Sequence, residues 1–210
     1  MFLLITGASG MGKSSVRRLL AAELEPEVAC VELGSVVPIP PWPTLAWRQE
    51  SAEAVVRLAL ELQAEGRHLL LSGDPVAPGE VVAAPSADQL DAVRACLLDA
   101  DPEQQEARLR GRGDPPSLLP THVAFAAWMR GHAADPSHMP EVLTTDAWEA
   151  MRWERWTDRP AEDPGWNVTT IDTSLFGVEE VAEATLAWAR ASLRGETPAL
   201  AVNAKGSPGS

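Results

Sequence analysis

The chain has 210 residues, of which 45% are hydrophobic, and a formal net charge of −13. This length suits one α/β domain with a substantial core, and the acidic balance counts against nucleic acid as a partner, because nucleic-acid-binding surfaces are usually basic. No run of eighteen apolar residues occurs, so we expect no signal peptide, no membrane span and a cytoplasmic protein. The two cysteines, Cys30 and Cys96, fit no metal or redox spacing, and we expect reduced core thiols.

Apolar runs alternate with helical stretches, which is the pattern of a parallel sheet covered by helices on both faces. The elements predicted in the first half are a strand at 2–6, a helix at 13–25, a strand at 28–33, a stiff proline-rich loop at 37–43, a helix at 45–65 and a strand at 68–72. The second half is predicted to hold a short helix opened by a capping box at 86–89, a strand at 95–99, a helix opened at 101–104, helices near 120–131 and 145–156, a strand at 166–171 and a helix at 178–193. The sum is a three-layer α/β/α domain over 1–195, followed by a Gly/Ser/Pro-rich tail at 196–210 that we expect to be disordered.

A phosphate-binding motif, GxxxxGKS, lies between the first predicted strand and the first predicted helix. Its glycines let backbone N–H groups converge on phosphate oxygens at the positive end of the helix dipole. We expect Lys13 to be an exposed cation that reaches the β- and γ-phosphates, and Ser14 to ligate Mg²⁺. The predicted nucleotide-binding residues are Gly7, Ala8, Ser9, Gly10, Met11, Gly12, Lys13, Ser14 and Ser15. This motif predicts binding of a nucleoside triphosphate.

Two further segments, Arg108-Leu109-Arg110-Gly111-Arg112 after Leu97–Pro102 and Ile171–Ser174 before the last helix, accompany the phosphate loop. With them the chain resembles the P-loop small-molecule kinases, such as the shikimate, gluconate and chloramphenicol kinases, over roughly residues 1–193. The resemblance implies an adenylate-kinase-like P-loop NTPase fold with strand order 2-3-1-4-5, and a helical lid and acceptor helices at about 102–160. It also implies ATP- and Mg²⁺-dependent phosphotransfer to a hydroxyl of a small-molecule acceptor, with lid arginines on the nucleotide and the transferred phosphoryl group.

The helical spacing sorts the three lid arginines. Glu106 precedes Arg110 by four residues in the favourable orientation for an ion pair, so we expect a structural role for Arg110. Arg108 and Arg112 share a face at i, i+4, where two like charges repel unless an anion neutralises both. A bound triphosphate would do so, and we predict that both arginines bind nucleotide and act in catalysis.

Two carboxylates are candidates for the catalytic base at the carboxyl edge of the sheet. Glu32 ends the second predicted strand, where the resemblance implies an acid, although kinases of this kind frequently carry an aspartate pair there. Asp74 follows the third predicted strand and could be the base, hold Mg²⁺ through water, or cap a turn. The sequence leaves the choice between Glu32 and Asp74 open.

The acceptor site is expected beside the second and third strands, where Trp42 and Trp47 flank the proline-rich loop. The acceptor could instead be a nucleoside or nucleotide. From a different class, the chain could be a nucleotide-dependent switch, but it lacks the guanine-reading N/TKxD motif that such a protein should carry. Neither the identity of the acceptor nor the oligomeric state follows from the sequence.

Overall fold

The structure is a computed structural model, and it describes residues 1–202. Five parallel strands form one sheet in the order β2-β3-β1-β4-β5, which confirms the predicted architecture and strand order. The strands are β1 (Phe2–Thr6), β2 (Val28–Val31), β3 (His68–Leu71), β4 (Val93–Asp99) and β5 (Val168–Asp172). All five residues of β1 are buried, because this central strand has neighbours on both sides and helices on both faces.

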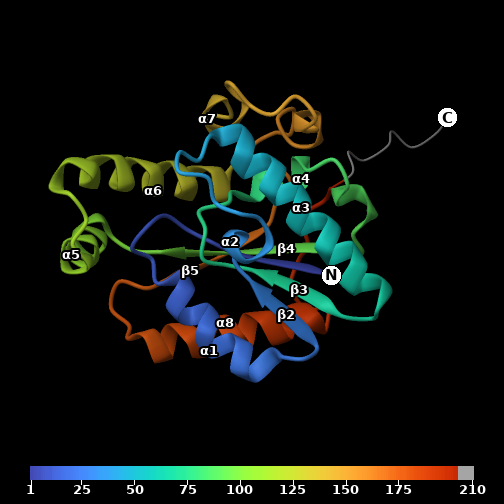
Figure 1. Cartoon of the computed structure of the whole chain (residues 1–210), viewed down its shortest axis with the longest axis horizontal. Helices are drawn as coiled ribbons and strands as arrows, with labels where there is room; N and C mark the ends of the chain where they lie inside the picture. Colours follow the sequence, from blue (N-terminus) through green and yellow to red (C-terminus); the bar gives the residue numbers. More distant parts are fainter. Residues whose placement is uncertain (203–210) are drawn as a thin grey trace.

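Helices cover the two faces of the sheet (Figure 1). One face packs against α1 (Lys13–Leu24) and α8 (Val178–Leu193). The other packs against α3 (Leu45–Ala64), α4 (Pro78–Ala83) and α6 (Leu119–Ala134). The remaining helices are α2 (Leu33–Val36), α5 (Pro102–Arg112), which lies beyond the carboxyl ends of the strands, and α7 (Glu141–Thr144). None of the helices within residues 1–202 combines the length and the apolar character of a membrane span.

The helix predicted at 145–156 is wrong. The chain instead leaves α7 at Thr144 and forms only a 3₁₀ turn at Trp153–Arg155. The backbone N–H groups that such a helix would use are bonded elsewhere: that of Trp148 donates to Gln49 Oε1 at 2.7 Å and that of Arg152 to the Ala83 carbonyl at 2.7 Å. Long-range partners therefore override the local helical pattern here.

Two other local predictions also differ from the structure. The capping box at 86–89 gives only a 3₁₀ turn, because the Ser86 hydroxyl donates to Glu53 Oε1 at 2.6 Å instead of capping a helix. Helix α4 was missed, although Pro78 in its first turn and Glu80, which accepts from the Ala77 N–H at 2.9 Å, form a recognisable helix start.

The predicted disordered tail begins too early. Leu200 pairs with Val93 as an antiparallel bridge at the start of β4, and the Arg94 side chain donates to the Thr197 carbonyl at 2.9 Å. The prediction of disorder is therefore wrong for residues 197–202, which pack against the sheet. Residues 203–210 lie outside the described residues.

A cluster of aromatic rings, formed by Trp128, His132, Trp156 and Trp166, fixes α6 to α4. The His132 ring is fully buried and stacks on Trp128 with ring centroids 5.1 Å apart. His132 Nε2 accepts from the Gly79 N–H at 3.2 Å, and Trp156 lies edge-on to His132. A Cβ at Gly79 would come within 2.8 Å of the Trp156 ring, so α4 can approach the cluster only with glycine at this position.

The substitution Gly79→Ala is therefore expected to lower the free energy of unfolding by about 1–3 kcal/mol through overpacking. Gly111→Ala is a matched control, because Gly111 lies in α5 with nothing within 4 Å of an added Cβ. That change should raise stability by about 0.5–1 kcal/mol, since alanine is the better helix former. Urea unfolding of both variants gives the comparison, and equal effects would contradict the packing argument.

Candidate nucleotide and acceptor site

The loop between β1 and α1 requires its glycines. Gly7 has a φ of +142°, and a Cβ there would lie 2.3 Å from the Leu98 carbonyl oxygen. Gly12 has a φ of +84° and caps α1 without any side chain. The N–H groups of Ser15 and Val16 donate to the Gly12 carbonyl, and within residues 1–202 those of Lys13 and Ser14 have neither a backbone partner nor a side-chain cap. Open N–H groups of this kind bind phosphate at a helix N-terminus.

A cavity of about 500 Å³ opens over this loop. It brings together eight of the residues that the sequence assigned to the nucleotide: Ser9, Gly10, Gly12, Lys13, Ser14, Ser15, Arg108 and Arg112. Gly7, Ala8 and Met11 are buried and do not line this cavity, so they shape the loop from beneath. We call this space the donor cavity.

Lys13 is not the exposed cation that the motif led us to expect. Its side chain lies at the floor of the donor cavity, the residue is only 5% exposed, and Nζ donates to the Ala8 carbonyl at 2.8 Å. Burial lowers the pKa of Lys13 to about 8; the positive charge of Arg112 adds to this effect, and the carboxylate of Asp74 opposes it. A buried ammonium with one neutral partner is thus ready to bind an anion.

The two arginines of α5 that were predicted to be functional both line the donor cavity. Arg108 donates from Nη1 to Thr173 Oγ1 at 2.8 Å and from Nη2 to the Thr173 carbonyl, so the start of the β5–α8 loop fixes its guanidinium. Arg112 is more loosely held, in an ion pair with Asp114 at 2.7 Å. Arg110 pairs with Glu106 at 3.1 Å, as predicted, and does not line the cavity.

A smaller space of about 190 Å³ adjoins the donor cavity on the α8 side, and Arg108 lines both. Its walls are largely apolar, with Val16 from α1 and Phe176 and Val178 from the segment that opens α8. A slot with apolar walls and a guanidinium suits a flat aromatic ring. Phe176 and Val178 were not among the residues predicted for the nucleotide site; their position directly after Ile171–Ser174 was the available signal.

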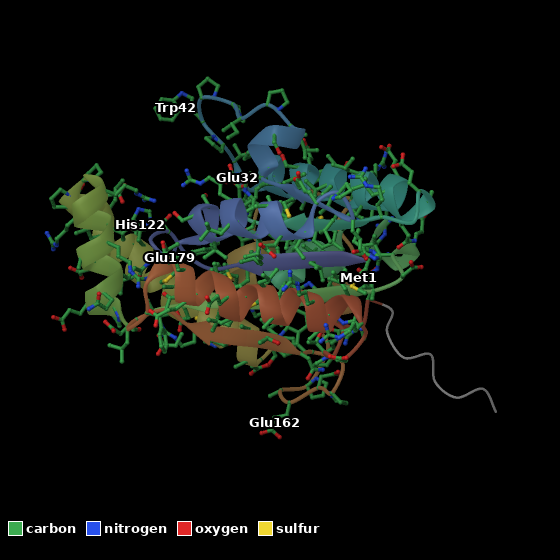
Figure 2. The ribbon with its side chains drawn as sticks, turned by 90° about the horizontal axis from the view of Figure 1, so that it is seen from below. Met1, Glu32, Trp42, His122, Glu162 and Glu179 are labelled. Carbon is green, nitrogen blue, oxygen red and sulfur yellow. The ribbon has the colours of Figure 1, made fainter. Side chains whose placement is uncertain are left out.

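A third cavity, of about 340 Å³, lies on the other side of the phosphate loop, against α2 and α3. Asp74 and Trp47 line it, whereas Trp42 is 87% exposed at the outer end of its loop, as Figure 2 shows. Pro75 lines both this space, which we call the acceptor cavity, and the donor cavity. The two cavities therefore meet at the segment Gly73–Pro75, beside the carboxyl end of β3.

Asp74 lies at this junction. Its Oδ2 accepts from the Leu33 N–H at 2.7 Å. Burial raises the pKa of Asp74 above its ordinary value, and the charge of Glu32 adds to this, while the Leu33 N–H, Lys13 and Arg17 oppose it. The carboxylate is thus electrostatically coupled to Lys13 while it lines the acceptor cavity.

Glu32, the other candidate base, lies away from the acceptor cavity. It precedes α2, and its carboxylate forms an ion pair with Arg17 of α1 at 3.1 Å. Its side chain packs against Gly73, where a Cβ would come within 2.7 Å of Glu32 Cγ. Glu32 lines none of the three cavities. The structure thus brings Asp74, but not Glu32, to the wall of the acceptor cavity.

Sequence reasoning missed an ion pair at the back of the acceptor cavity. Arg48 Nε lies 2.8 Å from Glu80 Oε1, and the Glu80 carboxylate is fully buried. The other oxygen of Glu80 accepts from the Ala77 N–H at 2.9 Å. No pattern in the sequence pointed to Arg48, because its partner lies 32 residues away on a helix that was not predicted.

Comparisons with known proteins find the fold alone. No protein-family profile matches the sequence, and no curated protein matches it. An unliganded sugar kinase from Janibacter sp. HTCC2649 is 17% identical, with a TM-score of 0.58 over 93% of this chain and 98% of that one. The APS kinase of Mycobacterium tuberculosis, solved with AMPPNP and APS, is 16% identical, with a TM-score of 0.50 over 90% of this chain and 96% of that one. The chain therefore has the fold of the P-loop small-molecule kinases, as its sequence motifs predicted.

Proposed function

We propose that this protein is an ATP- and Mg²⁺-dependent phosphotransferase that moves the γ-phosphoryl group to a hydroxyl of a small molecule. The observation that carries the proposal is the meeting of two cavities at Gly73–Pro75. One has the cations and open N–H groups that a triphosphate needs, and the other has a carboxylate at its wall. A nucleotide switch has no need for the second cavity.

On the donor side, the phosphate loop and Lys13 bind the β- and γ-phosphates, and Arg108 and Arg112 neutralise charge that develops on the transferred group. The base of the nucleotide occupies the apolar slot beside Phe176 and Val178. Among residues 1–202, no three His, Cys, Asp or Glu side chains group as a metal site. Mg²⁺ suits this arrangement nonetheless, because it needs only one or two protein ligands besides phosphate oxygens and water. Ser14 would hold the ion, and the ion would neutralise phosphate charge. That Asp74 also binds the ion, through a water molecule, stays a prediction.

On the acceptor side, Asp74 accepts the proton of the attacking hydroxyl. The contact with the Leu33 N–H fixes one carboxylate oxygen and leaves the other as the proton acceptor. Its raised pKa makes it a better base than an ordinary aspartate. The ion pair with Arg17 makes Glu32 the weaker candidate.

The test is a screen of hydroxylated small molecules with purified protein, ATP and Mg²⁺, which measures the release of ADP. The panel includes sugars, amphiphilic alcohols, nucleosides and nucleotides, so that the nucleoside or nucleotide kinase alternative is tested alongside. We expect acceptor-dependent ADP release and a phosphorylated product by mass spectrometry. Tight ATP binding with ADP release that no acceptor stimulates would instead support a switch.

The arginines of α5 give a second test of the donor side. Arg108→Ala and Arg112→Ala are each expected to lower kcat by about tenfold or more, because each removes a cation that acts on developing charge. Arg110→Ala is the matched control on the same helix, and it should change stability by only a few tenths of a kcal/mol through its exposed pair with Glu106. Steady-state kinetics of the three variants show which of these arginines contribute to kcat. A catalytic defect confined to Arg110→Ala would contradict this assignment.

A further inference from the structure

We propose that the acceptor is a neutral, largely apolar alcohol with one hydrogen-bond-accepting group, such as an amide carbonyl, that Arg48 receives. The inference rests on the proposed function and extends it to the class of substrate. It is carried by the composition and charge of the acceptor cavity, in particular by the constrained Arg48 side chain.

The walls of the acceptor cavity are mainly apolar. Of its nine lining residues, six carry apolar side chains: Leu33, Ile39, Pro43, Leu45, Trp47 and Pro75. At its mouth, the proline-rich loop holds Ile39 and Trp42 well exposed, with Trp42 at the outer end of the loop (Figure 2). Walls of this kind favour a ligand that buries a ring or an alkyl chain.

Only three of the nine lining residues are polar, so the cavity offers few hydrogen-bond partners to a ligand. The Thr44 hydroxyl already accepts from the Trp47 N–H at 3.1 Å as the cap of α3. Asp74 is required for the reacting hydroxyl, which leaves Arg48. A sugar or sugar acid would bury several hydroxyl groups with few partners, and each unpaired group would weaken binding.

Arg48 has free donors in a fixed orientation. Its Nε is bonded to the buried Glu80 carboxylate, and within residues 1–202 neither Nη1 nor Nη2 donates a hydrogen bond. The guanidinium therefore presents its outer N–H groups while its charge is neutralised from behind. With Arg48 and Glu80 paired, Asp74 is left as the excess charge in the cavity, and this disfavours an anionic acceptor.

In the reaction, the acceptor oxygen bonds to the γ-phosphorus as the bond from that phosphorus to the β,γ-bridging oxygen breaks. ADP leaves, and the hydroxyl proton passes to Asp74. The apolar group lies against Trp47 and Leu45, and the accepting group lies against Arg48. The distance between the hydroxyl and the accepting group in the substrate is thus set by the span from Asp74 to Arg48.

The experiment measures binding without nucleotide, by calorimetry and by tryptophan fluorescence. The probes are N-acetyl-phenylalaninol and N-acetyl-leucinol, which have an apolar group, one hydroxyl and one amide carbonyl. The comparison compounds are 3-phenylpropan-1-ol, which lacks the carbonyl, and D-glucose and D-gluconate. We expect at least one N-acetyl alcohol to bind about fivefold to tenfold more tightly than 3-phenylpropan-1-ol and more tightly than either sugar compound.

Two variants test whether these compounds bind in the acceptor cavity. Arg48→Lys keeps a cation for Glu80 but removes the outer guanidinium donors, so it should abolish the advantage of the N-acetyl alcohols and leave 3-phenylpropan-1-ol unaffected. Trp47→Phe should remove the fluorescence change, while calorimetry should still show the preference for the N-acetyl alcohols over 3-phenylpropan-1-ol, because this preference depends on Arg48. Thermal melting checks that both variants are folded.

Tighter binding of D-glucose or D-gluconate, an unaltered preference in Arg48→Lys, or no binding of either N-acetyl alcohol would overturn the inference. The outcomes also distinguish a failure of this inference from a failure of the proposed function. If an N-acetyl alcohol binds as expected but no acceptor in the screen is phosphorylated, the ligand class stands and the activity does not. If only polyols are phosphorylated, the activity stands and the ligand class does not.

Discussion

Replacing Lys13 with alanine is expected to lower kcat/KM for phosphotransfer by about 10³-fold or more. The reason is the position of Nζ at the floor of the donor cavity, where it has a single neutral partner in the Ala8 carbonyl. A bound triphosphate supplies the anion that this buried ammonium otherwise lacks. ADP release and ATP binding by calorimetry measure the effect, and Lys13→Arg should be equally inactive, because a planar guanidinium does not fit the place of a compact ammonium.

The same residue predicts a pH dependence of activity. The pKa of Lys13 in the free protein is about 8, and the protonated form is the one that binds phosphate. Since kcat/KM reports the ionisation of the free enzyme, it should fall as pH rises through about 8. The residual activity of Lys13→Ala should lack this decrease. A wild-type profile that stays flat up to pH 10 would contradict the role given to Lys13.

The free energy of unfolding should rise, whereas activity falls, as pH increases above about 8. The folded pKa of Lys13, about 8, lies below its ordinary value of 10.5, so the unfolded chain binds the proton more tightly. The destabilising contribution of the buried ammonium is thus fully present below pH 8 and declines between about 8 and 10.5. Lys13→Ala should therefore remain folded at pH 7 while it is inactive. An unfolded variant would mean that the lysine contributes to the core.

The sheet and the phosphate loop were predictable because their signals are local. Buried parallel strands appear as short apolar runs, and the loop needs glycine wherever a side chain would collide, as at Gly7 against the Leu98 carbonyl. The start of α5 was equally clear, since Asp101 caps the helix by accepting from the Gln104 N–H at 2.8 Å. Each of these features is encoded within a few residues of where it occurs.

Features that depend on distant partners were not predictable in this way. The motif identified Lys13 but not its burial; the backbone of this residue lies against the β3–α4 segment, where the Ser72 hydroxyl donates to the Lys13 carbonyl at 3.4 Å. The Arg48–Glu80 pair joins two helices, one of which was missed. The sequence likewise could not separate Glu32 from Asp74, because both follow neighbouring strands. They are distinguished by distant contacts: Glu32 pairs with Arg17, and Asp74 lines the acceptor cavity.

The assignment of the catalytic base to Asp74 rather than Glu32 gives the last prediction. Asp74→Asn is expected to lower kcat by about 10²–10⁴-fold with a much smaller change in KM, because a general base acts as the hydroxyl proton leaves. Asparagine retains an oxygen that can accept from the Leu33 N–H, so the segment Gly73–Pro75 should keep its shape. In the wild type, kcat/KM should fall as pH decreases through the raised pKa of Asp74, and this acid limb should vanish in the variant.

Glu32→Gln is the matched control, since it removes the neighbouring carboxylate of the same sheet edge. It should replace the partly exposed ion pair with Arg17 by at most a neutral hydrogen bond and change kcat only slightly. Because the charge of Glu32 also raises the pKa of Asp74, the acid limb of Glu32→Gln should move to lower pH. A large loss of kcat in Glu32→Gln, with Asp74→Asn active, would assign the base to Glu32. Such an outcome would require the acceptor hydroxyl to approach over Gly73 from the side of α1, because Glu32 packs against this glycine and pairs with a residue of that helix.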